Sequence, residues 1–167
     1  PGGIKLYDKY LECTVAGTIA TLSGQAYGTW EWDMLKGADG NSSIISLISD
    51  AIGTDFSSSP DWNGYALILN SSEAVLINKY IASTSRTSLF SSANSYININ
   101  QWYHVKVTRT KAGVFTVWVD DVLLDVSGGS GTNPVTDTTH STSVLTVLDN
   151  DAGDRVANFN YTDEILQ

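Results

Sequence analysis

The sequence predicts an all-β fold, an antiparallel β-sandwich. Apolar and polar residues alternate with period two in many short segments, and no window of twelve residues or more holds an apolar stripe at helical spacing. The chain is rich in aromatic residues that favour strands, with five Trp, eight Tyr and four Phe. Its 167 residues are the size of one domain, so 1–167 is expected to form a single core. Many short strands in one domain imply two packed sheets.

Each expected strand is an alternating run that ends at a cluster of Gly, Asn, Asp or Ser. In chain order, the expected strands are Ile4–Tyr7, Leu11–Val15, Thr18–Leu22, Tyr27–Leu35, Ser43–Ile48, Gly64–Asn70, Ala74–Tyr80, Ser88–Ser91, Tyr103–Thr110, Val114–Asp120, Val122–Val126, Ser143–Leu148 and Arg155–Tyr161. The most apolar stretches are Ile44–Ile48 and Ala74–Ile77, which are far shorter than the ~20 residues of a membrane-spanning helix. The sequence therefore predicts no membrane span.

The clearest hairpin lies within Trp102–Val126. Thr110–Gly113 supplies one turn, and Asp120-Asp121 supplies a second, tighter one. In both strands of this hairpin, apolar residues alternate regularly with polar ones. One face of the hairpin is therefore expected to pack on the second sheet while the other stays accessible.

Three loops are expected beside the accessible face. Asp50–Asp61 and Ser127–His140 are long polar stretches, and loops of that length in a compact domain are usually functional or flexible. Gly37–Asn41 is the third. No internal repeat and no shift of composition indicates a second domain.

Charge and cysteine content exclude several classes of function. The formal net charge of -9 repels a phosphate backbone, so nucleic acid is not an expected partner. Cys13 is the one cysteine, which excludes an intramolecular disulfide, and its apolar neighbours predict a buried, inert thiol. With two His and one Cys, the chain is poorly equipped for zinc or copper.

The sequence opens with Pro1-Gly2-Gly3, with neither an initiator methionine nor a charged-then-apolar signal segment. We therefore expect the domain to be processed or cut from a longer polypeptide. An extracellular or surface-exposed location, on a virion or a cell surface, is the expected setting.

Two segments resemble a known superfamily. Asn100 to Arg109 reads N-Q-W-Y-H-V-K-V-T-R, and the strand that follows reads G-V-F-T-V-W-V-D-D-V. This pair resembles the central hairpin of concanavalin A-like lectin and glucanase domains, including laminin G-like modules, which commonly reads W-H-V-x-V-x-R and then Y/W-V-D-G. Tyr27 to Met34, Y-G-T-W-E-W-D-M, is similar to the superfamily strand G-x-W-E-F-D-L. The resemblance implies a concanavalin A-like jelly roll, a scaffold shared by lectins, polysaccharide-binding modules, glycosidases, polysaccharide lyases and virion or adhesin domains.

The chain departs from this superfamily in two places. Asp121 stands where the tight turn usually has Gly, and Asp tolerates the positive φ that the turn requires. In laminarinase-type glycosidases a similar strand reads E-x-D-x-x-E or E-x-D-x-E, with two Glu as nucleophile and general acid/base. Here the second Glu would fall at Leu35 or Lys36, neither of which supplies a carboxylic acid. We therefore expect no enzyme activity and no catalytic residues.

Alternation predicts one polar face on the concave sheet, with Trp30, Trp32 and Met34 on the buried side. Sugar sites combine an aromatic ring, which covers the apolar face of a pyranose, with polar groups that pair with its hydroxyls. The expected ligand-binding residues are Tyr27, Glu31, Asp33, His104, Lys106, Thr116 and Trp118. The alternative is that a loop or a neighbouring subunit covers this face.

A cluster of carboxylates indicates a calcium site. Asp149, Asp151 and Asp154 share one loop around Gly153, and hard oxygen ligands at alternating positions suit Ca²⁺. A second option is the turn Asp39-Gly40-Asn41. The other interpretation of both clusters is a solvated acidic turn.

Two main hypotheses for function remain open at this point. The first is a non-catalytic carbohydrate-binding, lectin-like module whose partner is a glycan or polysaccharide. The second is a structural or adhesive domain of a virion, phage appendage or cell-surface protein, whose partners are proteins in an assembly. A degenerate glycoside hydrolase-like domain is a third.

Overall fold

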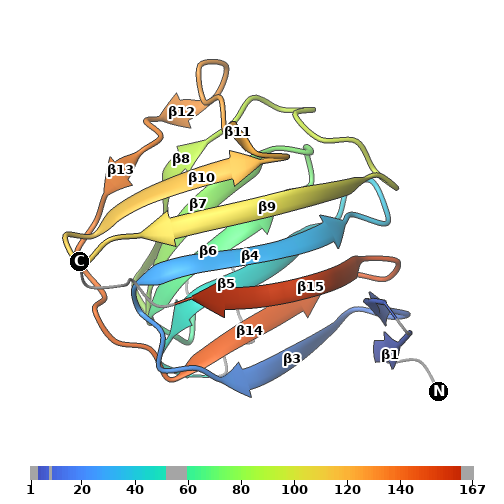
Figure 1. Cartoon of the computed structure of the whole chain (residues 1–167), viewed down its shortest axis with the longest axis horizontal. Coiled ribbons are helices and arrows are strands. Elements are labelled where there is room, and N and C mark those ends of the chain that lie inside the picture. The colour runs from blue at the N-terminus through green and yellow to red at the C-terminus, as the bar shows by residue number, and fades with distance from the viewer. Residues whose placement is uncertain (1–3, 8, 52–59, 163–167) are drawn as a thin grey trace.

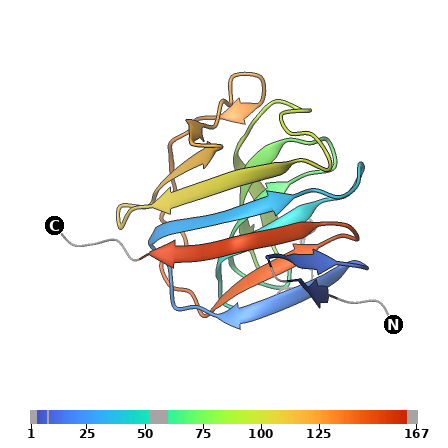
Figure 2. The ribbon, with the colours of Figure 1, turned by 45° about the vertical axis from the view of Figure 1, so that its right-hand side comes forward.

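The computed structural model describes residues 4–7, 9–51 and 60–162, which form two antiparallel sheets packed face to face (Figure 1). The eight-stranded sheet has the order β1 (Ile4–Leu6), β2 (Leu11–Cys13), β15 (Arg155–Thr162), β4 (Gly28–Leu35), β9 (Trp102–Arg109), β10 (Val114–Val119) and β11 (Val122–Leu123), with β13 (Val135–Thr136) also paired to β10. The seven-stranded sheet has the order β12 (Ser130–Gly131), β8 (Ser85–Ser91), β7 (Val75–Ile81), β6 (Gly64–Leu69), β5 (Ser43–Ser49), β14 (Leu145–Asn150) and β3 (Gly17–Leu22). Figure 2 shows the two layers from a second direction. The predicted all-β sandwich is confirmed.

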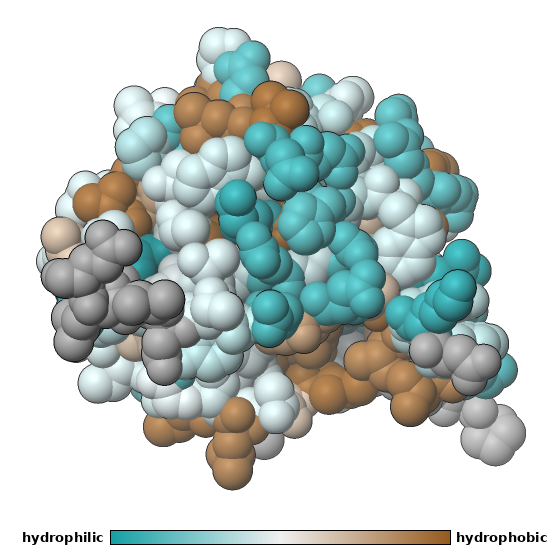
Figure 3. Space-filling model, in the orientation of Figure 1, coloured by the Kyte–Doolittle hydropathy of each residue, from teal (hydrophilic) through white to brown (hydrophobic). Residues whose placement is uncertain are grey.

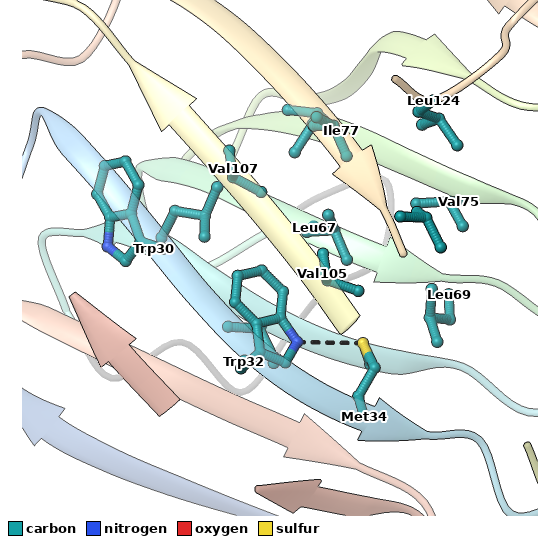
Figure 4. Packing of buried hydrophobic residues seen from close by; sticks show 14 of the residues in the cluster. Trp30, Trp32, Met34, Leu67, Leu69, Val75, Ile77, Val105, Val107 and Leu124 are labelled. Atoms are coloured by element: carbon teal, nitrogen blue, oxygen red, sulfur yellow. Dashed lines mark hydrogen bonds between the residues drawn. The ribbon is translucent and has the colours of Figure 1, made fainter. Parts of the chain in front are cut away.

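The main core lies between the two sheets. Trp30, Trp32 and Met34 point inward from β4, each no more than 1% exposed, as the alternation predicts. They pack with aliphatic side chains from both sheets, and the indole N–H of Trp32 lies 3.2 Å from the sulfur of Met34 (Figure 4). This packing fixes which side chains of β4 are left for the outer face.

Strand bounds differ from those expected in a few places. β8 begins at Ser85 rather than Ser88, because Arg86 and Thr87 are exposed and give no apolar alternation, although they pair with β7. The loop Ser127–His140 contains the short strands β12 and β13. Within the loop Asp50–Asp61, residues 52–59 lie outside the described part of the chain.

β11 ends at Leu123, whereas a strand to Val126 was expected, because an asparagine side chain intervenes. The Asn133 amide accepts from the N–H of Val117 at 3.1 Å and donates to its carbonyl at 2.8 Å. The same amide donates to the carbonyl of Leu124 at 3.0 Å. The side-chain amide of Asn133 thus hydrogen-bonds to the backbone of β10 in the place that a neighbouring strand would take beyond the end of β11.

The tight turn after β10 has a left-handed backbone. Asp120 and Asp121 have φ of 51° and 63°, and Val119 pairs directly with Val122 across them. The Asp120 carboxylate accepts the N–H of His104 at 2.8 Å, which ties the turn to β9. The expectation that this turn forms without Gly is confirmed.

Asp121 is the position where a glycine is expected to raise stability. Asp121→Gly removes the strain of a left-handed non-glycine residue, partly offset by a more flexible unfolded chain, and should raise the free energy of unfolding by about 0.5 kcal/mol. Asp121→Val should lower it by about 1–2 kcal/mol because β-branched residues resist positive φ. Urea denaturation measures both. Destabilisation by Asp121→Gly would contradict this account of the turn.

One buried arginine holds the end of the sandwich at the last residue of β9. Arg109 is 1% exposed and donates to the carbonyls of Ala26, Asp137 and His140 at 2.8, 3.1 and 2.7 Å. Its guanidinium carbon lies 4.8–5.0 Å from the ring centroids of Tyr27, Tyr65 and Phe115. The loop before β14 is thereby fixed to both sheets.

His140 lies in the same cluster and is expected to make stability depend on pH. Its Nε2 donates to the carbonyl of Tyr80 at 2.8 Å, and burial lowers its pKa from 6.5. The unfolded chain therefore binds a proton at His140 more readily than the folded protein does. Above about pH 6.5 His140 is neutral in both states and the free energy of unfolding is unaffected; as the pH falls below this value, the free energy of unfolding decreases.

A difference measurement isolates the effect of His140, because burial raises the pKa of Asp149 and of Asp154 and those groups act with the opposite sign. We expect the free energy of unfolding of the native protein, relative to His140→Gln, to fall between pH 7.5 and pH 5.5. A difference that stays flat over this interval would show that His140 does not carry the effect.

The predicted burial of Cys13 is confirmed. Its side chain is 5% exposed, and burial together with the nearby Asp154 raises its pKa to about 11. The thiolate is therefore scarce at neutral pH. Among the described residues, no helix has the length and apolar character to cross a membrane.

Candidate functional site

The outer face of the eight-stranded sheet carries a polar surface built in rows across the strands. Asp33 on β4 lies opposite His104 on β9, and directly opposed residues of antiparallel strands share a face. One row further along, Lys106 lies between Glu31 on β4 and Trp118 on β10. Figure 3 shows hydrophilic side chains gathered over these strands. Six of the seven expected ligand-binding residues lie on this outer face: Glu31, Asp33, His104, Lys106, Thr116 and Trp118.

Tyr27 is placed differently from the expectation. Gly28, directly after it, has φ of 113°, so the alternation of β4 does not continue back to Tyr27. The Tyr27 ring lies 4.8 Å from the guanidinium carbon of buried Arg109 and packs against the core. Tyr27 therefore supports the end of the sandwich, away from the face of Glu31 and Asp33.

Asp33 is the centre of a hydrogen-bonded row on this face. One of its carboxylate oxygens lies 2.8 Å from Nδ1 of His104, and the other accepts from the side-chain amide of Asn158 at 2.6 Å. Because a carboxylate only accepts hydrogen bonds, Nδ1 of His104 carries the proton in this pair. The three side chains hold one another in fixed orientations.

A pocket of about 510 Å³ opens at this row. It is lined by Lys9, Tyr10, Asp33, Trp102, Ala157 and Asn158. Trp102 is 38% exposed, and the ring of Tyr10 meets it edge-on with centroids 5.9 Å apart. An aromatic wall thus stands beside a fixed carboxylate and amide.

Five of the six lining residues, all except Asp33, were not among the expected site residues. Trp102 lies two residues before His104 on the same strand, so alternation along β9 contained the signal for it. Asn158 reaches Asp33 because a bulge in β15, with φ of 52° at Asn158, changes the register there. Tyr10 comes from the segment between β1 and β2. Neither of these two placements has a sequence signal.

Trp118 shares the outer face but has a covered ring. The ammonium of Lys106 lies 4.9 Å from the centroid of its indole. None of the described residues that line the pocket belongs to the loops Gly37–Asn41, Asp50–Asp61 or Ser127–His140, which were expected beside the site. The pocket lies at the Trp102 end of this face.

The strand position that would complete a glycosidase motif is turned inward. Leu35 is 4% exposed and Lys36 is fully buried. The ammonium of Lys36 forms an ion pair with Glu73 and donates to the carbonyl of Asn70 at 2.9 Å. Neither residue reaches the outer face on which Glu31 and Asp33 lie.

The carboxylate of Asp154 holds two loops together. It is 1% exposed and accepts from the N–H of Gly37 at 2.8 Å, the hydroxyl of Ser43 at 2.6 Å and the N–H of Asp151 at 3.0 Å. Burial raises its pKa, although these three bonds oppose the shift. Asp154 therefore has a structural explanation that needs no metal.

The other two candidate calcium ligands also accept hydrogen bonds. Asp149 accepts from the hydroxyl of Thr18 at 2.8 Å, and Asp151 accepts from the N–H of Ser42 at 3.1 Å. Within residues 4–7, 9–51 and 60–162, no group of three or more His, Cys, Asp or Glu side chains is arranged to hold a metal ion. Calcium binding stays a prediction.

Comparison with known proteins identifies the fold. No protein-family model and no curated protein matches the sequence. The carbohydrate-binding module CBM66 from Bacillus subtilis superposes with a TM-score of 0.70 at 17% identity, over 98% of this chain and 92% of that one. The fold is the concanavalin A-like jelly roll. The resemblance drawn from the two sequence segments is thus confirmed at the level of the fold.

Other jelly rolls are equally similar. The exoplasmic/lumenal domain of VIP36, in its Ca²⁺/Man3GlcNAc-bound form, superposes with a TM-score of 0.72 at 13% identity, over 100% of this chain and 86% of that one. A Parabacteroides distasonis protein described as a glycosyl hydrolase gives 0.65 at 10% identity, over 97% and 90%. Proteins described as having different functions thus share this jelly roll, so the function of this chain has to be argued from its site.

Proposed function

We propose that this protein is a non-catalytic carbohydrate-binding module whose site is the pocket beside Trp102. The observation that carries the proposal is the half-exposed indole next to the fixed Asp33–Asn158 pair. An indole stacks on the C–H face of a sugar ring, while a carboxylate accepts hydrogen bonds from sugar hydroxyls. Because hydrogen bonds already orient Asp33, little side-chain entropy is lost on binding.

The comparisons support the same class of ligand. CBM66 is a carbohydrate-binding module, and the VIP36 domain was solved with Man3GlcNAc bound. Binding to a glycan or polysaccharide is the role we transfer to this chain. An extracellular or surface-exposed location follows from that role.

Binding without hydrolysis is the second part of the proposal. Glu31 faces Lys106 across the strands, and the buried Lys36 supplies no second carboxylate beside it. A pair of carboxyl groups flanking the scissile bond is what most glycosidases require. Incubation with β-glucans should therefore release no reducing ends. Turnover that disappears in Glu31→Gln would contradict this part.

A glycan and polysaccharide array tests the ligand class directly. It is run with excess Ca²⁺ and again with a chelator, and we expect binding confined to one sugar family. Loss of binding under chelation would support the calcium prediction for Asp149, Asp151 and Asp154, and binding retained with the chelator would refute a requirement for it. A blank in both arms would overturn the proposal and favour the structural or adhesive alternative, which predicts a stable trimer or larger assembly by light scattering.

A further inference from the structure

A second hollow, which is apolar, adjoins the pocket at Trp102. This groove has a volume of about 360 Å³ and lies where β3 and β14 of one sheet approach β15 and the β1–β2 segment of the other. Its walls include the side chains of Leu6, Leu11, Ile19, Leu148, Val156 and Phe159. Figure 3 shows hydrophobic side chains at the lower right, where Figure 1 places β1 and β3.

The pocket and the groove form one continuous cleft. Lys9, Tyr10, Ala157 and Asn158 line both. Aromatic rings also run from one to the other, because Tyr10 stacks on Tyr7 at 4.9 Å and meets Trp102 edge-on at 5.9 Å. A ligand seated on Trp102 therefore has a direct path into the groove.

The chemistry changes along this cleft. Asp33 and Asn158 offer hydrogen bonds at the Trp102 end, whereas the groove offers mostly aliphatic and aromatic carbon. Thr21 and Thr146 are the polar residues that line the groove but not the pocket, so a second sugar unit there would bury most of its hydroxyls without partners, which is costly. A hydrocarbon chain would instead gain from leaving water. The ring of Tyr10 is already occupied by Tyr7 and by Arg155, whose guanidinium carbon lies 5.2 Å from its centroid. The groove is therefore a poor platform for a continuing polysaccharide.

We infer that the cleft binds glycosides with an apolar aglycone, such as an alkyl glycoside or a glycolipid. The sugar lies on Trp102 beside Asp33, and the hydrocarbon lies in the groove between Ile19 and Phe159. This inference rests on the proposed function and names its ligand class.

Paired ligands separate the two halves of the cleft. Isothermal titration compares the methyl and the hexyl glycosides of the sugar identified by the array, below the micelle concentration. Burial of a methylene contributes about 0.8 kcal/mol, or roughly fourfold in Kd. For the sugar that binds, we expect the hexyl glycoside to bind at least tenfold more tightly than the methyl glycoside.

Two matched variants on β3 locate the gain. Ile19 lines the groove, whereas Leu22 is on the same strand, 86% exposed and outside it. Ile19→Gln should remove most of the hexyl advantage and leave methyl glycoside binding unchanged, and Leu22→Gln should change neither. Trp102→Ala should weaken both ligands.

Each result bears on a different part of the cleft. Equal affinity for methyl and hexyl glycosides would overturn the inference and leave the sugar site standing. If the hexyl glycoside still bound more tightly than the methyl glycoside in Ile19→Gln, the hydrocarbon would lie elsewhere. If hexyl glycosides of different sugars bound Trp102→Ala equally well and as tightly as the native protein, the binding would be non-specific apolar binding. A blank array would refute the proposed function and this inference together.

Discussion

Arg109→Met is expected to lower the free energy of unfolding by about 3 kcal/mol or more. Methionine fills part of the space but donates no hydrogen bond. The carbonyls of Ala26, Asp137 and His140 would lose their donor, and each buried polar group left without a partner costs about 1–3 kcal/mol. Water can partly reach the loop in the variant, so the total loss should be smaller than the sum of three such costs.

Two further variants give this prediction its controls. Arg109→Lys keeps the charge but lacks the planar fork that reaches several carbonyls, so an intermediate loss is expected. Lys5→Met removes an exposed cation and should change stability by less than about 0.5 kcal/mol. Urea unfolding followed by tryptophan fluorescence measures all three. A loss below about 1 kcal/mol for Arg109→Met would show that the loop does not depend on this clamp.

Trp102→Ala is expected to weaken glycan binding about tenfold or more, because an aromatic anchor that the ligand buries contributes upwards of 1.4 kcal/mol. Trp118→Ala is the matched control, since both indoles lie on the outer face of the same sheet. Its ring is covered by Lys106, at 4.9 Å, and lies outside the pocket, so its loss should change affinity less than about threefold.

Titration of both variants with the sugar found on the array decides between the two ends of the face. Far-ultraviolet circular dichroism confirms that each variant is folded. If Trp118→Ala abolished binding while Trp102→Ala bound normally, the site would lie on the row of Glu31 and Lys106 instead.

The fold was predictable because the chain alternates consistently where both sheets face the core. Trp30, Trp32 and Met34 point inward, and Arg109 lies on the face opposite His104, as period two requires. The alternation failed at Tyr27 because the backbone of Gly28 is outside the extended region. One residue with positive φ was enough to reverse a side chain.

The site was only partly predictable because it depends on contacts between distant segments. Asp33 and His104 followed from strand pairing, but Asn158 reaches them through a bulge whose position no local pattern marks. Tyr10 comes from a segment of the chain far in sequence from Trp102. The acidic loop shows the same dependence on distant segments, because the carboxylate of Asp154 accepts from the N–H of Gly37, 117 positions earlier.

Nuclear magnetic resonance can show directly whether a sugar binds in the pocket beside Trp102. Each of the five Trp residues has one indole N–H, and we expect the signals of Trp102 and Trp118 to be assigned by their loss in Trp102→Ala and Trp118→Ala. On titration with the sugar identified by the array, we expect the indole signal of Trp102 and the side-chain amide of Asn158 to shift together, with the Trp118 signal unmoved. Shifts confined to Trp118, or to residues outside this pocket, would show that the sugar does not bind beside Trp102.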